Sequence, residues 1–119
     1  MTSGIEEALS THTATLGDID VTYSRSGTGP AVVLIHGLAE DHLSWRKVQE
    51  ADLGVTTYAY DLRGHGSTTV GTPDGSLAQL RDDLIAFLEN VTGPAICVGF
   101  SLGGGTVVLS AAAVRPDLL

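Results

Sequence analysis

Ser101 stands between glycines in the stretch GFSLGGG, and this spacing could support nucleophilic chemistry. Gly99, Ser101 and Gly103 form the pattern G-x-S-x-G. Between a strand and a helix, this pattern makes a sharp turn that exposes the serine hydroxyl. The first N–H groups of the helix then face the negative charge that develops when the hydroxyl attacks a carbonyl. We therefore expect Ser101 to be a nucleophile; the alternative is a glycine-rich turn in which Ser101 only caps the helix.

The segments on either side of Ser101 have the character that such a turn requires. AICVGF, which follows Pro94, is a short apolar run and predicts a buried strand. Residues 102–114 predict a helix that Pro116 ends. Glycine at positions 99 and 103 is expected to remove steric collisions around the strained serine.

The rest of the chain must hold this turn in place. THTATLGDIDVTYSRSG predicts a hairpin that turns at Gly17 and Asp18. AVVLIHG and GVTTYAYD predict strands, and the continuous aliphatic run of the first is typical of a strand covered on both faces.

Two further helices are predicted, one between these two strands and one between GVTTYAYD and AICVGF. EDHLSWRKVQE fits a short helix. DGSLAQLRDDLIAFLENV has apolar residues at three- and four-residue steps, with Ser76 and Gln79 as a capping box. The resulting order predicts an α/β fold: a three-layer sandwich with a mostly parallel sheet, opened by an antiparallel hairpin.

Composition restricts the partners and the compartment. The chain has 119 residues and a net charge of −8, with no cluster of Lys and Arg, so we expect no nucleic-acid partner. Cys97 is the single cysteine and lies in an apolar run, which excludes a disulfide framework and predicts a buried, inert thiol. With no signal-like N-terminus, no apolar run long enough for a bilayer and no metal-ligand set, we expect a cytoplasmic protein without membrane contact or cofactor.

Three motifs together resemble the α/β-hydrolase fold. They are LIHGLAEDHLSW, YDLRGHGST and VGFSLGGG, in this order and each at the C-terminal end of a predicted strand. The resemblance runs from about Val21 to Leu119. We expect residues 1–10 to be a flexible N-terminus and residues 11–119 to be a partial α/β-hydrolase domain.

The resemblance also implies roles at the site. Ser101 would be the nucleophile, and the backbone N–H groups of Leu102 and Leu38 would be the oxyanion donors. Gly37 and His36 would lie beside the substrate, although the histidine of this motif usually holds loops together by hydrogen bonds.

Other residues in or near the motifs are expected to be structural. His65 would hold a loop, Asp61 and Arg63 would bond to the loops beside the site, and Trp45 would pack the short helix against the sheet. His12 and His42 match no motif position of the family and are expected to be polar surface.

A serine at the nucleophile position favours one branch of chemistry. Relatives that open epoxides place an aspartate there because their reaction passes through an alkyl ester. Ser101 instead favours hydrolysis of an ester, thioester, lactone or amide, with a small-molecule acyl substrate. The third glycine of GFSLGGG is also similar to cofactor-free perhydrolases, which gives an alternative activity for a complete protein.

The chain lacks the other groups that an activated serine needs. In this fold the acid and the histidine follow the nucleophile, yet no histidine follows Ser101, and the only acid there is Asp117. We therefore expect an N-terminal part of a serine hydrolase, truncated after the helix that follows Ser101 and inactive or feebly active alone.

Truncation would leave AICVGF as an open apolar edge prone to self-association. Two alternatives stay open: a non-catalytic interaction module, and complementation by a second chain that supplies the acid and the histidine.

Overall fold

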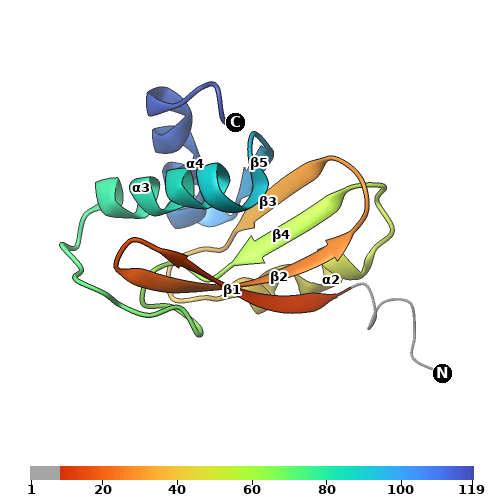
Figure 1. The fold of residues 1–119 in the computed structure, drawn as a ribbon, viewed down its shortest axis with the longest axis horizontal. Helices are drawn as coiled ribbons and strands as arrows, with labels where there is room; N and C mark the ends of the chain where they lie inside the picture. The colour runs from red at the N-terminus through yellow and green to blue at the C-terminus, as the bar shows by residue number, and fades with distance from the viewer. Residues whose placement is uncertain (1–8) are drawn as a thin grey trace.

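A five-stranded sheet of order β1-β2-β4-β3-β5 runs through the centre of the structure, a computed structural model that describes residues 9–119 (Figure 1). Its strands are β1 (Ser10–Leu16), β2 (Ile19–Gly27), β3 (Ala31–Ile35), β4 (Thr56–Tyr60) and β5 (Ile96–Gly99). β3 pairs parallel with β4 and β5, whereas β2 pairs antiparallel with β1 and β4. The carboxyl ends of β3, β4 and β5 therefore meet at one edge of the sheet, where all three motifs lie.

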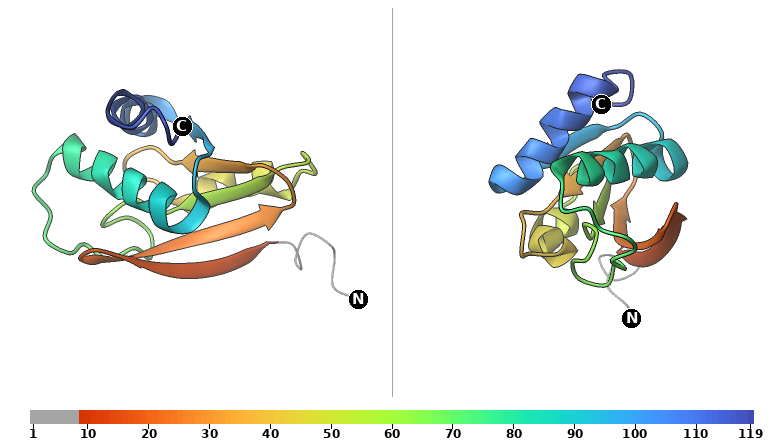
Figure 2. Two further views of the ribbon diagram at one scale, coloured as in Figure 1. Left: turned by 45° about the horizontal axis from the view of Figure 1, so that its top comes forward. Right: turned by 90° about the vertical axis from the view of Figure 1, so that its left-hand side faces the viewer.

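Helices cover both faces of this sheet. The chain forms η1 (His42–Trp45), α2 (Arg46–Glu50), α3 (Leu77–Phe87), the π-helical turn η2 (Leu88–Thr92) and α4 (Ser101–Val114). Figure 2 shows α3 and α4 on one face and α2 on the other. The predicted fold class is confirmed, and the sheet is mixed. Most of the expected flexible N-terminus lies outside the described residues, but Ser10 already belongs to β1.

The predicted hairpin is confirmed. β1 and β2 pair up to Leu16 and Ile19, so Gly17 and Asp18 form the connection. Gly17 has a φ of 61°, a left-handed conformation that glycine adopts without steric cost. The turn places Asp18 where its carboxylate reaches Arg63, far along the chain.

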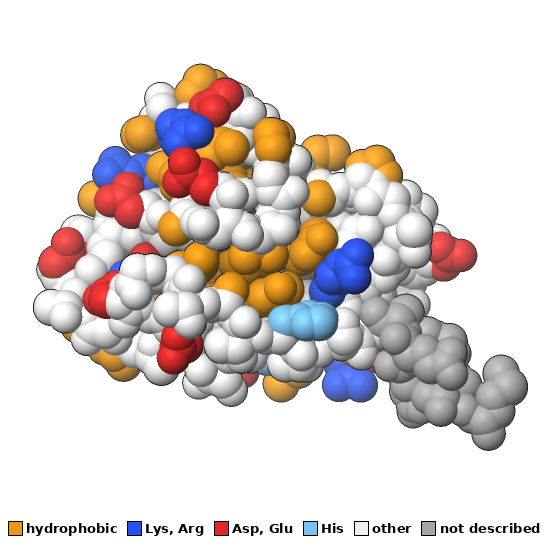
Figure 3. Space-filling model, in the orientation of Figure 1, with side chains coloured by type: hydrophobic (Ala, Val, Ile, Leu, Met, Phe, Trp, Pro, Cys, Tyr) orange, Lys and Arg blue, Asp and Glu red, His pale blue; other side chains and the backbone are white. Residues whose placement is uncertain are grey.

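The core lies mainly between the sheet and the helices α3 and α4. Phe87 is fully buried and stacks on Tyr60, with ring centroids 4.8 Å apart. Tyr23 and Tyr58 are only partly buried and pack on Phe87 from the sheet. In Figure 3 hydrophobic side chains gather in the hollow between the helices and the hairpin. This part of the core is therefore open to solvent.

Gln49 joins the short helix to the sheet through hydrogen bonds. Trp45 is partly buried, and its ring meets that of Phe100, directly after β5, at 6.3 Å, which agrees with the expectation that it packs this helix against the sheet. Gln49 is buried, and its side-chain amide accepts a hydrogen bond from Ser24 Oγ at 2.9 Å and donates to Thr57 Oγ1 at 3.3 Å. Its carbonyl accepts from Ser26 Oγ at 2.8 Å. The contact is polar, which explains the lack of an apolar stripe in this segment.

The cap of α3 differs in part from the predicted capping box. Ser76 Oγ accepts from the N–H of Gln79 at 3.1 Å, as predicted. The return bond is shifted, because Gln79 Oε1 accepts from the N–H of Asp74 at 3.0 Å while the N–H of Ser76 bonds to the Asp74 carboxylate at 2.8 Å. The Asp74 carboxylate therefore accepts from the N–H of Ser76, the donor that would bond to Gln79 in a capping box.

β5 forms an edge of the sheet. It pairs with β3 alone among the described strands, and its outward side chains Ile96 and Val98 are 61% and 41% exposed. Cys97 alternates with them and faces the core, where burial raises the pKa of its thiol to about 11. The thiol is therefore protonated at neutral pH and a poor nucleophile. Across residues 9–119, no helix is both long and apolar enough to cross a membrane.

Candidate active site

The backbone turns sharply at Ser101, between β5 and α4. Phe100 is extended, with φ −97° and ψ 134°, and Ser101 has a φ of 60° as the first residue of α4. A positive φ is costly for a residue with a Cβ atom. Ser101 is nevertheless exposed, so the strain holds a hydroxyl in the open rather than in the core. Such outliers concentrate at functional sites.

Three glycines allow α4 to approach the strands this closely. A Cβ on Gly99 would collide with the carbonyl group of Gly104, and a Cβ on Gly104 would lie 2.6 Å from the carbonyl oxygen of Ile35. A Cβ on Gly103 would lie 2.7 Å from Leu38 Cγ and 3.0 Å from Leu38 N. The collisions predicted at positions 99 and 103 are confirmed, and their partners are the helix itself and the turn after β3.

The turn after β3 lies directly beside the serine. The N–H of Glu40 donates to the carbonyl of Gly37 at 3.2 Å, and Ala39 has a φ of 68°. Ser101 Oγ lies 2.5 Å from the place where a Gly37 Cβ would stand. Within residues 9–119 no group accepts a hydrogen bond from the N–H of Leu38. The two non-glycine residues with a positive φ, Ala39 and Ser101, therefore lie in neighbouring turns, and Gly37 leaves room between those turns for Ser101 Oγ.

The geometry bears on both expected oxyanion donors. Leu102 lies in the first turn of α4, where helix N–H groups have no partner within the helix. Leu38 N lies close to the same turn through Gly103. Their roles as donors remain predictions, and this placement of the two N–H groups favours them.

His36 is wholly buried beneath this turn. Its Nε2 accepts from the N–H of Leu62 at 3.0 Å, so Nδ1 carries the proton and donates to the carbonyl of Gly37 at 2.7 Å. Burial lowers the pKa of His36 and keeps the ring neutral. Both ring nitrogens are occupied, which favours the loop-holding role over contact with substrate. His65 packs at 5.2 Å from the His36 ring and bonds to the carbonyl of Arg63.

Asp61 ties two loops together at the end of β4, as expected. It is fully buried, and its carboxylate accepts from the N–H and the Nδ1 of His42, each at 2.7 Å, and from the N–H of Ser67 at 3.0 Å. The expectation that His42 is only polar surface is therefore wrong. A local signal was absent, because the pair is formed across 19 residues. By contrast, His12 is exposed as expected.

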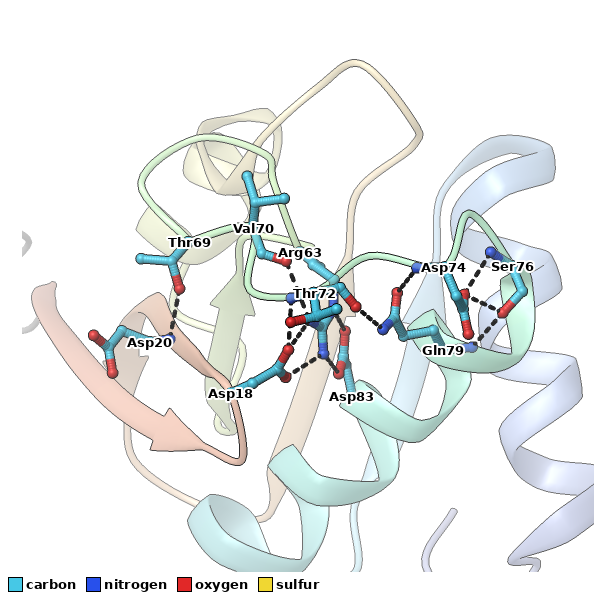
Figure 4. Close-up of polar contacts among 10 residues, drawn as sticks. All are labelled: Asp18, Asp20, Arg63, Thr69, Val70, Thr72, Asp74, Ser76, Gln79 and Asp83. Atoms are coloured by element: carbon cyan, nitrogen blue, oxygen red, sulfur yellow. Dashed lines mark hydrogen bonds and ion pairs between the residues drawn. The ribbon is translucent and has the colours of Figure 1, made fainter.

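Arg63 is the centre of the second network (Figure 4). Its guanidinium binds both carboxylate oxygens of Asp83 on α3 and both of Asp18 in the hairpin turn, all at 2.9 Å. It also donates to the carbonyl of Val70 at 3.1 Å. Arg63 thus joins the hairpin, the loop after β4 and α3, which confirms a structural role.

A pocket opens beside the serine on the α2 face of the sheet. It has a volume of about 290 Å³ and is lined by Glu40, Ser44, Trp45, Val48 and Phe100. The rings of Trp45 and Phe100 meet edge to face at 6.3 Å. Phe100 precedes the serine, and Glu40 bonds to Gly37 at 3.1 Å. This pocket can take a small, mainly apolar group near the turn that carries Ser101, although Ser101 itself is not among its lining residues.

A base for Ser101 is not found in the described part of the chain. No residue from 9 to 119 hydrogen-bonds to Ser101 Oγ. Asp117 is exposed, and its carboxylate is paired with the guanidinium of Arg115 at 2.9 and 3.0 Å. The same residues contain no group of three or more His, Cys, Asp or Glu side chains that could hold a metal ion.

The glycine run gives a prediction with its own control. Gly104→Ala is expected to lower the free energy of unfolding by about 2 kcal/mol, because its methyl group meets the backbone of Ile35. Gly105→Ala should raise it by about 0.5–1 kcal/mol, because a Cβ there meets no atom within 4 Å and alanine favours the helix. Urea unfolding measures both; equal effects from the two substitutions would contradict the close approach of α4 to β3.

Comparisons with known proteins agree with this geometry. The model of the alpha/beta hydrolase family matches residues 32–119. An epoxide hydrolase from Caballeronia sordidicola is 31% identical over 98% of this chain and 37% of its own length. Lipase LipV from Mycobacterium tuberculosis is 37% identical over 83% of this chain and 38% of its own length. Protein phosphatase methylesterase 1 from Mus musculus is 34% identical over 82% of this chain and 28% of its own length.

Solved structures are similar over nearly the whole chain. A protein described as a lipase, from Acinetobacter baumannii, has a TM-score of 0.83 and 31% identity over 98% of this chain and 43% of its own. Potato epoxide hydrolase has a TM-score of 0.85 and 27% identity over 93% of this chain and 37% of its own. The chain spans about a quarter to two-fifths of the length of these relatives. With its motifs at the carboxyl ends of three parallel strands, the chain belongs to the alpha/beta hydrolase family.

Proposed function

We propose that this chain is the nucleophile-bearing part of a serine hydrolase that cleaves an ester or a related acyl bond. The observation that carries the proposal is the exposed Ser101 at a φ of 60°, beside the turn that contains Leu38. Its hydroxyl would attack the acyl carbon, and the N–H groups of Leu102 and Leu38 would stabilise the oxyanion. The pocket beside Phe100 would take one substituent of the substrate.

The residue type at position 101 selects acyl transfer among the activities of the relatives. Those relatives include a lipase, a methylesterase and epoxide hydrolases. Attack on an epoxide by a serine would leave an ether that water does not cleave, whereas attack on an ester leaves an acyl-enzyme that water hydrolyses. Serine therefore supports the lipase and methylesterase type of chemistry.

The acid and the histidine of the catalytic triad would come from polypeptide outside these 119 residues. β5 is the last strand of the sheet and pairs only with β3 among the described strands, so its free edge is where such polypeptide, or a second copy of the chain, would add a strand. A non-catalytic interaction module remains the second candidate, because this same edge could serve binding alone.

Turnover of two small substrates tests the proposal. The purified chain is expected to hydrolyse 4-nitrophenyl acetate above the buffer rate, by up to about a thousandfold, because oxyanion donors and binding retain this much without a triad. It should not convert styrene oxide to the diol. Ester turnover that equals the buffer rate would favour the binding module, and diol formation would overturn the assignment to acyl transfer.

A further inference from the structure

The carboxylate of Glu40 closes the turn that carries the expected oxyanion donor. The N–H of Gly37 donates to Glu40 Oε1 at 3.1 Å, and the N–H of Glu40 donates back to the carbonyl of Gly37 at 3.2 Å. Ala39, inside this ring of two bonds, has a φ of 68°. An alanine in this conformation needs support from its surroundings, and the two bonds across the turn supply it.

The same carboxylate lies next to the nucleophile. A Cβ on Gly37 would stand 2.5 Å from Ser101 Oγ and 3.0 Å from Glu40 Oε1. Ser101 and Glu40 nevertheless make no hydrogen bond with each other, and Oε1 is already occupied by the N–H of Gly37. Glu40 therefore holds the turn beside Ser101 and does not act as a base for the Ser101 hydroxyl in this structure.

We propose that Glu40 is a positioning residue for the oxyanion turn, a role that rests on the proposed function of Ser101. By accepting from Gly37, its side chain fixes the His36–Gly37 peptide, while the N–H of Glu40 holds the carbonyl of the next peptide, Gly37–Leu38. The turn that these two bonds close aims the Leu38 N–H at a tetrahedral anion on Ser101. This role needs the Glu40 oxygen that accepts the hydrogen bond, and it does not need the negative charge of the carboxylate. A full negative charge a few ångströms from a second anion costs free energy even in a partly exposed site.

Substitution of Glu40 separates the acceptor from the charge. Glutamine keeps an oxygen that accepts from Gly37 but removes the charge, whereas alanine removes both. Phenylboronic acid is the probe: a bond forms between Ser101 Oγ and boron, the hydroxyl proton goes to solvent, and the adduct is a tetrahedral anion. Its affinity can be measured by titration while the backbone amide signals are followed by NMR.

We expect Glu40→Ala to weaken phenylboronic acid binding about fivefold, the range of one lost hydrogen bond, while Glu40→Gln binds at least as tightly as the unaltered chain. The amide signal of Gly37 should move upfield in Glu40→Ala, which loses the acceptor, and stay near its original position in Glu40→Gln, which keeps it. Equal weakening by Gln and Ala would overturn the proposal and assign the effect to the charge. A Gly37 amide signal that stays unchanged when Glu40 is substituted by alanine would also overturn it.

Two controls distinguish a failure of the proposed role of Glu40 from a failure of the proposed role of Ser101. If Ser101→Ala binds the probe as well as the unaltered chain does, or if no form binds it, the proposed nucleophile fails. The Gly37 amide signal still decides whether Glu40 holds the turn, because that measurement needs no reaction at Ser101.

Discussion

Replacing Arg63 with alanine is expected to lower the free energy of unfolding by about 3 kcal/mol, the range for breaking a buried ion pair. The substitution leaves Asp83 with one-tenth of its side chain exposed and no cation, and it frees Asp18 in the hairpin turn. The hairpin, the loop after β4 and α3 then lose their common partner. Thermal or urea unfolding, followed by circular dichroism, measures the loss.

Arg46→Ala is the matched control. Arg46 pairs with Glu50 one helical turn away at 2.9 Å, but its side chain is 58% exposed. Exposed pairs of this spacing contribute only about 0.3–0.5 kcal/mol. Similar losses from Arg63→Ala and Arg46→Ala would contradict a buried role for Arg63.

The Arg63 network also predicts a response to acid. The hydrogen bonds from Arg63, and then the N–H of Thr72, lower the pKa of Asp18 well below its ordinary value of 3.8. Because the pKa is lowered in the folded state, the stabilisation is complete above the unfolded value and is lost as the pH falls from 3.8 toward the folded value. In Arg63→Ala this part of the acid dependence should shrink; an unchanged profile would contradict the coupling.

On the proposed mechanism, Ser101→Ala is expected to abolish the initial burst of 4-nitrophenol that accompanies formation of an acyl-enzyme, while steady turnover falls only to the level that oxyanion donors and binding retain without a triad. The reason is that the proposed covalent intermediate needs the hydroxyl, while the surrounding N–H groups would only stabilise charge. Ser110→Ala, the same substitution within α4 but away from the turn, should leave the burst unchanged. The initial time course with 4-nitrophenyl acetate measures both variants.

Strain at the serine gives an independent readout of the same residue. Ser101→Gly should also lose the burst, yet it should raise the free energy of unfolding by up to about 1 kcal/mol, because glycine adopts a φ of 60° without the cost of a Cβ. A variant that loses both the burst and stability would argue that position 101 serves packing rather than catalysis.

The order of elements was predictable because each element carries a local pattern. The aliphatic run of β3 reflects burial on two faces, and the three- and four-residue spacing of α3 reflects burial on one face. The structure confirms the strand and the helix. The attachment of α2 was not predictable, since Gln49 docks through hydrogen bonds to Ser24 and Thr57. A buried glutamine in a short polar segment has no periodic signature.

The site was predictable where one short motif contains all the partners. The positive φ of Ser101 and the need for glycine at positions 99 and 103 follow from a strand that turns into a helix. The pairing of His42 with Asp61 and the position of Glu40 beside Ser101 depend on how three strand ends come together. Such contacts join distant segments, and their residues look like ordinary surface groups in the sequence.

The most direct test of the central claim, that the turn at residue 101 presents a nucleophile to oxyanion donors, is peptide mapping by mass spectrometry after exposure to a fluorophosphonate. The account predicts one phosphonyl group on Ser101, gained more slowly than in a hydrolase whose serine is hydrogen-bonded to a histidine, and absent in Ser101→Ala. Modification of other residues with Ser101 left free, or no modification at all, would contradict it.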